Sequence, residues 1–332
     1  MPADGHAPTL SHEIDDRGHG RTAVLIHSLA LDRSVWDGLR GQLAATHDLV
    51  LLDLPGHGGS QAIQEPTIDW MADEVERLLA VSLGETPVLA IGMSLGGCVA
   101  QALAIRHPHR VARLGLIDTT CWYGPSAAAD WAERAGRAER DGMGSLAEFQ
   151  LERWFTPRFR AERPDEGRRL LEVFGRTQLP DYVATCRAMG AMDMRESARA
   201  IRVPTAIVVG DQDKATPPRH AHDLHERIAD STLQVLSGCA HLSAVERPDA
   251  VCAALRPVGL AKSNPHIRHL ERTLPSASTA IRRPGGQAAS RRRRTRWRRT
   301  GTSRRSRPRA GACGRGCRRW RAAPRPGSAR TR

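Results

Sequence analysis

The chain has 332 residues, enough for one large α/β domain or two ordinary ones. Its formal net charge of +14 is divided unevenly: residues 1–260 carry 27 Lys and Arg against 35 Asp and Glu, whereas residues 261–332 carry 23 against 1. Residues 290–332 contain no Ile, Leu, Val, Phe or Met, which excludes a packed C-terminal domain because too little apolar surface is available to offset the ordering entropy.

Targeting and redox signals indicate a cytoplasmic protein. No apolar run approaches the roughly 20 residues that a membrane span needs. The first residues, MPADGHAPTL, have neither the basic nor the apolar region of a signal peptide. The five cysteines before residue 260 are scattered among apolar neighbours without a Cys-x-x-Cys pair, so we expect reduced core thiols and no metal site.

Short β-branched or Leu-rich runs alternate with amphipathic segments through the first 258 residues. Runs of this length and apolar content are typical of parallel strands covered on both faces. Strands are expected at 22–26, 49–52, 88–91, 113–117, 205–209 and 232–236. Helices are expected from Ile68 to Leu78, whose apolar residues recur at helical spacing, and at 97–107, 219–229 and 247–256. This alternation predicts an α/β fold with a mostly parallel, doubly wound sheet.

One interval, residues 119–202, interrupts the alternation. It has helical patterns without a convincing strand and holds nine of the 11 aromatic residues that precede residue 260. We interpret it as a helical cap that closes over the carboxyl edge of the sheet. The predicted organisation is therefore a core in two parts, 1–118 and 203–258, with the cap between them and a basic tail at 259–332.

The basic tail has three interpretations. The preferred one is an out-of-frame or otherwise non-selected extension, because the composition changes abruptly to Arg, Ala, Gly, Pro and Ser after the helical pattern stops at Arg256-Pro257. The second is a disordered, solvated tail. The last is an arm that binds nucleic acid non-specifically, through phosphate contacts of arginine runs such as 291–294.

The sharpest chemical signal is Gly92-Met93-Ser94-Leu95-Gly96, placed between an expected strand and an expected helix. A G-x-S-x-G sequence in this position predicts a nucleophile elbow, a strained turn that lifts the serine hydroxyl above the sheet. The glycines leave room for the close approach of strand and helix. Ser94 is therefore the candidate nucleophile.

A serine hydroxyl needs a base, and the base needs an orienting carboxylate. In this type of sheet the three follow in the order serine, acid, histidine. His241, in the loop after the last expected strand, is the candidate base, and Asp213, in the loop after the preceding strand, is the candidate acid. Asp211 is expected to cap that loop, and Asp118, at the end of an earlier strand, is the reserve acid.

The strand at 22–26 runs into a second functional loop, His27-Ser28-Leu29. If this strand adjoins the elbow strand, the backbone N–H groups of Leu29 and Leu95 form an oxyanion hole, where each donor contributes about 3–4 kcal/mol to transition-state stabilisation. His27 and His57 are expected to organise turns. His220, His222 and His225 lie in a polar helical segment and are expected to be solvated.

With these residues in place, the sequence resembles the α/β-hydrolase superfamily, and within it the 3-oxoadipate enol-lactonases. The resemblance spans about residues 10–256 and rests on the loop at 27–29, the elbow at 92–97, the acid loop at 210–218 and His241 with its neighbours. The sequence departs from the lactonase pattern at His27, where asparagine is expected, and at Pro55, where arginine is usual.

The resemblance implies a serine hydrolase that opens an enol-lactone through an acyl-enzyme, with no metal or organic cofactor. Its substrate is then a small carboxylate lactone, so the cap should supply a cation or amide donors; Trp131 and Arg187 are the candidates. A C–C bond hydrolase or a general carboxylesterase is the alternative within the same fold. A ligand receptor that keeps the fold without catalysis is the alternative from another class.

Overall fold

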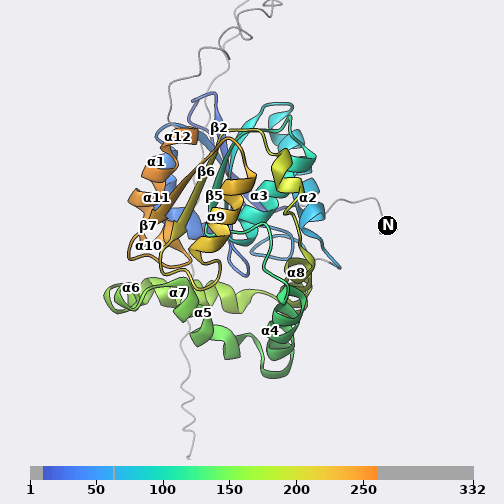
Figure 1. Ribbon diagram of the computed structural model, residues 1–332, viewed down its shortest axis with the longest axis vertical. Helices are drawn as coiled ribbons and strands as arrows, with labels where there is room; N and C mark the ends of the chain where they lie inside the picture. Colours follow the sequence, from blue (N-terminus) through green and yellow to red (C-terminus); the bar gives the residue numbers. More distant parts are fainter. Residues whose placement is uncertain (1–9, 63, 260–332) are drawn as a thin grey trace, which may run out of the picture. The chain divides into compact units, whose positions relative to one another are not determined.

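A mostly parallel sheet organises the chain, as seen in a computed structural model that describes residues 10–62 and 64–259 (Figure 1). Within these residues the sheet has seven strands in the order β1-β3-β2-β4-β5-β6-β7. The strands are β1 His12–Asp15, β2 Thr22–Ile26, β3 Asp48–Leu52, β4 Val88–Met93, β5 Val111–Ile117, β6 Thr205–Gly210 and β7 Ser231–Leu236. The prediction of a doubly wound, mostly parallel sheet is confirmed.

The six expected strands are β2 to β7, which pair in parallel, and the one that the sequence analysis missed is β1, which pairs antiparallel to β3. All residues of β2, β3, β4 and β6 are buried, as expected for strands covered on both faces. The same expectation is wrong for β7, which alternates partly exposed and exposed residues along most of its length. As an edge strand, β7 has a neighbour on one side alone.

Helices cover both faces of the sheet (Figure 1). The short helices α1 (Asp37–Leu43) and α11 (Pro248–Ala254) lie on one face, and α2 (Ile68–Leu83) and α3 (Leu95–Arg106) lie on the other. The remaining core helices are η1 Arg33–Trp36, α9 Pro218–Arg227, α10 Ser243–Glu246 and α12 Arg256–Gly259. Helix α2 begins where Thr67 accepts a hydrogen bond from the backbone N–H of Trp70, so a side-chain cap starts the predicted helix.

Helices from residues 119–202 lie together below the sheet in Figure 1. They are α4 Ala127–Asp141, η2 Met143–Leu146, α5 Ala147–Trp154, α6 Pro157–Glu162, α7 Pro164–Arg176 and α8 Leu179–Ala191. The last helix of the interval, η3 Ser197–Ala200, lies against α3 and α9 of the core. Aromatic rings hold several of them together. Phe174 of α7 lies with its ring centre 5.8 Å from those of both Trp154 and Tyr182, in edge-to-face geometry. The clustering of aromatics in this interval thus forms the core of the helical layer.

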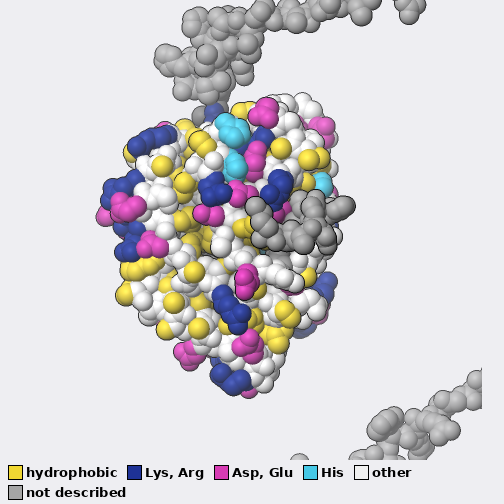
Figure 2. Space-filling model, turned by 90° about the vertical axis from the view of Figure 1, so that its right-hand side faces the viewer, with side chains coloured by type: hydrophobic (Ala, Val, Ile, Leu, Met, Phe, Trp, Pro, Cys, Tyr) yellow, Lys and Arg dark blue, Asp and Glu magenta, His cyan; other side chains and the backbone are white. Residues whose placement is uncertain are grey.

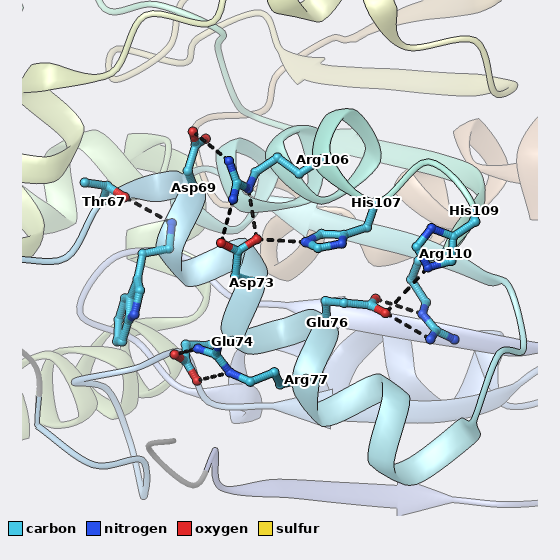
Figure 3. A network of polar contacts seen from close by, with 11 residues as sticks. Thr67, Asp69, Asp73, Glu74, Glu76, Arg77, Arg106, His107, His109 and Arg110 are labelled. Carbon is cyan, nitrogen blue, oxygen red and sulfur yellow. Dashed lines mark hydrogen bonds and ion pairs between the residues drawn. The ribbon is translucent and has the colours of Figure 1, made fainter. Parts of the chain in front are cut away.

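A polar network clamps α2 against α3 and the turn that follows it (Figure 3). Asp73 of α2 accepts two hydrogen bonds from Arg106, at 2.9 and 2.7 Å, and lies 2.7 Å from the ring nitrogen of His107. Arg110 is fully buried and donates two hydrogen bonds to Glu76, at 2.8 and 3.0 Å. Buried charges are stable only when paired in this way. The network fixes the helix that begins directly after Ser94.

The surface of the described residues carries mixed charge. On the face shown in Figure 2, basic and acidic side chains are interspersed, with histidines among them. No helix within the described ranges is long and apolar enough to cross a membrane. The predicted basic tail lies outside the described residues, apart from its first residue, 259.

Candidate active site

The turn between β4 and α3 has the geometry of a nucleophile elbow. Ser94 adopts φ 54° and ψ −116°, a conformation that a non-glycine residue rarely takes. A Cβ atom on Gly92 would lie 2.1 Å from the carbonyl oxygen of Gly96, and one on Gly96 would lie 2.0 Å from the carbonyl oxygen of Ile26. Both glycines are therefore required by the close passage of backbone over backbone, as the sequence analysis expects.

Three residues far apart in the sequence meet above this turn. The Ser94 hydroxyl lies 2.9 Å from Nε2 of His241, and Nδ1 of His241 lies 2.8 Å from Oδ2 of Asp213. They come from the loops after β4, β7 and β6 and are all buried. Since the carboxylate only accepts, Nδ1 donates to Asp213, and the free lone pair of Nε2 accepts the serine proton. The arrangement is that of a nucleophile, a base and an orienting acid.

Asp213 is held as a carboxylate by the loop around it. Its Oδ1 accepts the backbone N–H groups of Ala215 and Thr216, at 2.7 and 2.9 Å, and its Oδ2 accepts the Thr216 hydroxyl at 2.9 Å. Burial opposes the charge, but the His241 imidazole and these hydrogen bonds together hold the pKa of Asp213 below its ordinary value. The negative charge needed to orient and stabilise the imidazole is therefore present at neutral pH.

Asp118, the reserve acid, occupies a different position. Its two oxygens accept the backbone N–H groups of Gly210, at 3.2 Å, and Ser243, at 2.9 Å. Burial, and then the charge of Asp213, raise the pKa of Asp118 well above the ordinary value. Within the described residues it makes no hydrogen bond to His241. Asp118 instead joins the start of the acid loop to the loop of the histidine.

The loop after β2 lies beside the elbow, because β2 and β4 are hydrogen-bonded neighbours. Leu29 lines the pocket that Ser94 opens into, and Leu95 is the first residue of α3, where backbone N–H groups lack acceptors within the helix. His27 fixes this loop: its Nε2 accepts the backbone N–H of Leu54 at 2.8 Å, and its Nδ1 donates to the carbonyl of Ser28 at 2.8 Å. The expected role of His27 as a turn organiser agrees with these contacts.

His57 lies behind this loop in a fully buried position. Its Nδ1 donates to the carbonyl of Pro55 at 2.9 Å, whereas its Nε2 has no hydrogen-bond partner among the described residues. Burial, and then the neighbouring His27, lower the pKa of His57 to about 3. A charged His57 is therefore incompatible with the folded chain at mildly acidic pH.

Because the pKa of His57 is lowered by folding, the unfolded chain binds the extra proton and stability falls as pH drops below about 6.5. Between pH 7.5 and 5.0 this site alone should cost about 2 kcal/mol of unfolding free energy. In urea titrations at both pH values, His57→Gln should lose less stability on acidification than the wild type, while the exposed-site control His222→Gln should match the wild type. An equal acid-induced loss in His57→Gln and the wild type would contradict this assignment.

A pocket of about 330 Å³ opens above Ser94. One side comes from the loops after the strands and includes Leu29 and His241, and the other comes from helices α4 and α5 of the helical layer. Trp131 of α4 lines it, as expected for a substrate-binding candidate. His220 also lines it, half-buried, with Nδ1 2.9 Å from the Thr120 hydroxyl, so the expectation that this histidine is simply solvated is wrong.

Arg187, the second substrate-binding candidate, lies elsewhere. Its side chain is exposed, 3.7 Å from Glu139, and borders a separate surface hollow. The expectation that it faces the substrate is wrong, because the residue before it, Cys186, takes the buried side of α8 and turns Arg187 outward. The arginines that do line the pocket are Arg134, Arg153 and Arg219, which the sequence analysis did not single out.

Other candidate centres are not formed by the part of the chain that the structure describes. No group of three or more His, Cys, Asp or Glu side chains there is placed to hold a metal ion. The five cysteines in this part are buried and unpaired. Asp211 accepts the backbone N–H of Gly238 at 2.8 Å and so caps the loop junction, as expected.

The sheet, the elbow and the helices inserted after β5 together define the α/β-hydrolase fold, and the chain belongs to the α/β hydrolase fold family, whose sequence model matches residues 23–248. Among its relatives, 3-oxoadipate enol-lactonase 2 of Acinetobacter baylyi is 29% identical over 71% of this chain and 87% of its own. A pimeloyl-[acyl-carrier protein] methyl ester esterase of Neisseria meningitidis is 32% identical over 71% of this chain and 76% of its own. The crystal structure of the enol-lactonase from Burkholderia xenovorans LB400 superimposes with a TM-score of 0.71 and 31% identity, covering 75% of this chain and 95% of that one. The chain is a hydrolase of this family.

Proposed function

We propose that the protein is a serine hydrolase that works through an acyl-enzyme, with Ser94 as nucleophile, His241 as general base and acid, and Asp213 as the orienting carboxylate. The observation that carries the proposal is the chain of hydrogen bonds from the strained Ser94 through His241 to Asp213, at 2.9 and 2.8 Å. The strained backbone belongs to Ser94, and the hydroxyl of this residue lies within hydrogen-bonding distance of a buried base, His241. This combination is typical of an activated nucleophile.

The proposed reaction begins when His241 accepts the Ser94 proton and the serine oxygen attacks the carbonyl carbon. The backbone N–H groups of Leu29 and Leu95 then stabilise the oxyanion. The ring C–O bond breaks, and His241 returns its proton to the leaving oxygen. A water molecule, deprotonated by His241, next attacks the acyl-enzyme and restores the Ser94 hydroxyl. In this division of labour, residues 119–202 act as a cap over the core formed by 1–118 and 203–258.

For the substrate, we propose an enol-lactone with a free carboxylate, of the kind named for the lactonase relatives. The enol released on ring opening tautomerises to a ketone, so the product is a 3-oxo acid such as 3-oxoadipate. Two arginines of the pocket, Arg134 and Arg153, support a negatively charged substrate. The five cysteines of the described residues are buried and unpaired, which supports a cytoplasmic location.

A carboxylesterase is the second candidate function, and the 32% identity to the pimeloyl-[acyl-carrier protein] methyl ester esterase favours it. The same three residues perform ester hydrolysis with an alcohol instead of an enol as the leaving group. A C–C bond hydrolase and a non-catalytic receptor are further alternatives on this fold. The hydrolytic centre therefore does not distinguish among these functions. They differ in the leaving group and in the size of the acyl part of the substrate.

The full chain should be assayed on 3-oxoadipate enol-lactone and on p-nitrophenyl acetate. We expect kcat/KM for the lactone to exceed that for the acetate by at least about 100-fold, since a matched substrate gains binding energy in the transition state. Equal values would overturn the lactonase proposal and leave a general esterase. A ring-cleavage diketone hydrolysed faster than either would assign a C–C hydrolase, and hydrolysis of none of these compounds would indicate a receptor.

A further inference from the structure

The loop between β7 and α10, which carries His241, is anchored through its backbone N–H groups. Near its start the N–H of Gly238 donates to a carboxylate of the core at 2.8 Å, and at its end the N–H of Ser243 donates to another at 2.9 Å. Both carboxylates follow strands of the sheet, so the two ends of the loop are fixed to the core. The residues that directly flank the base, Ala240 and Leu242, are held in a different way.

The residue after the base is held by the cap. The backbone N–H of Leu242 donates to the carbonyl oxygen of Trp154, the last residue of α5, at 3.0 Å. Both residues are buried, so this hydrogen bond lies away from solvent. Helix α5 also forms part of the wall of the pocket above Ser94. The helix that lines the pocket therefore contacts the base loop one residue beyond His241.

The residue before the base is held by a carboxylate that also binds the cap. Oε2 of Glu246, in α10, accepts the backbone N–H of Ala240 at 2.8 Å. Its Oε1 accepts the backbone N–H of Thr156 at 3.2 Å and the Thr156 hydroxyl as well. The oxygen of this hydroxyl also accepts the N–H of Phe159 and so caps α6. One carboxylate thus joins the residue before His241 to the segment between α5 and α6.

An ion pair does not account for Glu246. Among the described residues its carboxylate contacts no lysine, arginine or histidine, and its donors are two backbone N–H groups and one hydroxyl. A carboxylate accepts such hydrogen bonds more strongly than a neutral group does. A surface hollow of about 360 Å³ opens beside it, between Phe159 of the cap and Gly238 of the base loop. The hydrogen bonds of Glu246 therefore bridge the cap and the core where side-chain packing leaves a gap.

We propose that Glu246 is a positioning residue, which makes the alignment of His241 with Ser94 depend on the seating of the cap. It acts through its hydrogen bonds to Ala240 and Thr156. The inference rests on the proposed function, in which His241 is the base, and it concerns a side chain outside the pocket. A cap that moved away from the core would loosen the contacts on both sides of the base. A displacement of about 1 Å at a reacting group costs about 100-fold in rate, so a small movement of the cap is enough to disable the hydrolytic centre.

The test measures two properties of the full chain: hydrolysis of p-nitrophenyl acetate, and the rate of inactivation by diisopropyl fluorophosphate, which depends on the alignment of Ser94 with its base. Glu246→Gln keeps the size of the side chain but leaves one acceptor oxygen, so one of the two bridged segments loses its acceptor. We expect kcat and the inactivation rate constant each to fall about 10–100-fold, with KM changed by less than about twofold. The control Glu162→Gln makes the same change on an exposed residue of α6 and should match the wild type.

Two variants of Thr156 test the contact with the cap separately. Thr156→Val is similar in size but lacks the hydroxyl donor, so kcat should fall about tenfold, whereas Thr156→Ser keeps the donor and should restore most of that loss. Added to Glu246→Gln, Thr156→Val should lower kcat by less than about a further twofold, because both changes act on the same bridge.

Urea unfolding of each variant distinguishes positioning from stability alone. A lower urea midpoint for Glu246→Gln, with kcat and the inactivation rate of the folded protein unchanged, would overturn the proposal. A loss carried by KM, additive losses in the double variant, or equal kcat in Thr156→Val and Thr156→Ser would also overturn it, and this last comparison decides alone if Glu246→Gln does not fold. A wild type that neither hydrolyses the ester nor reacts with the fluorophosphate would instead overturn the proposed hydrolase function.

Discussion

Replacing Ser94 with alanine is expected to lower kcat by a factor on the order of 10⁶, the scale seen when a serine protease loses its nucleophile. In the proposed mechanism the hydroxyl oxygen forms the acyl-enzyme, and no second hydroxyl is hydrogen-bonded to Nε2 of His241 among the described contacts. Hydrolysis of p-nitrophenyl acetate and of 3-oxoadipate enol-lactone measures the loss. The exposed Ser197→Ala is the matched control and should keep full activity.

The stability of the Ser94 variants shows whether a loss of activity comes from the missing hydroxyl or from a change in the fold. Alanine has the same backbone restriction as serine, so Ser94→Ala retains the strain of a φ of 54°. Glycine adopts this conformation freely, so Ser94→Gly should be inactive and about 1 kcal/mol more stable than Ser94→Ala in urea unfolding. Activity of Ser94→Ala above one hundredth of the wild type would show that the reaction does not depend on a serine nucleophile.

Most of the strands that could be predicted from the sequence are buried on both faces, so their residues are apolar at successive positions. Strands β2, β3, β4 and β6 are largely apolar runs because they lie fully buried between two helical layers. Strand β1 has the sequence His-Glu-Ile-Asp and is mostly exposed at the edge of the sheet. Most of its residues are polar, so it lacks the apolar run by which the other strands are predicted. Helix α1 was missed for a related reason: it buries two residues, Leu39 and Leu43, in seven.

The hydrolytic centre was easier to predict than the pocket. Ser94, Asp213 and His241 each follow a predictable strand closely, and the carboxyl ends of neighbouring parallel strands meet at one edge. The pocket wall depends on which face of each cap helix turns toward the sheet, and that is decided by tertiary packing. Arg153 follows Gln150 by one helical turn on the pocket side of α5, whereas Arg187 lies on the solvent side of α8. An arginine in a helical pattern carries no sign of this difference.

The choice between Asp213 and Asp118 as the acid also depends on tertiary contacts that the sequence does not show. Asp118 directly follows β5 and Asp213 lies in the loop after β6, and both carboxyl groups bind residues of the loop that carries His241, so the sequence alone leaves two acids. The structure separates them by their donors: Asp213 accepts from the imidazole, whereas Asp118 uses both oxygens on the backbone of Gly210 and Ser243. Among the described residues, Asp118 makes no hydrogen bond to the imidazole. Asp118 is therefore a positioning residue rather than a substitute acid.

Replacing Asp213 with asparagine is accordingly expected to lower kcat by about 10⁴-fold, although the residue remains buried and similar in size. Two backbone N–H groups keep their acceptor, but an amide at the Oδ2 position donates to Nδ1 of His241, moves the imidazole proton to Nε2 and so removes the lone pair that accepts from Ser94. KM should change little, because the carboxylate does not line the pocket.

Asp118→Asn is the matched comparison, since it makes the same chemical change in the neighbouring carboxyl. It should lower kcat by about tenfold at most and reduce stability by about 1–3 kcal/mol, because one of two backbone N–H groups loses its acceptor in the interior. Steady-state kinetics on p-nitrophenyl acetate and urea unfolding of both variants distinguish the two roles. The assignment is wrong if Asp118→Asn loses more activity than Asp213→Asn, since the carboxylate that orients His241 would then be Asp118, and the contact between Asp213 and the imidazole would be structural.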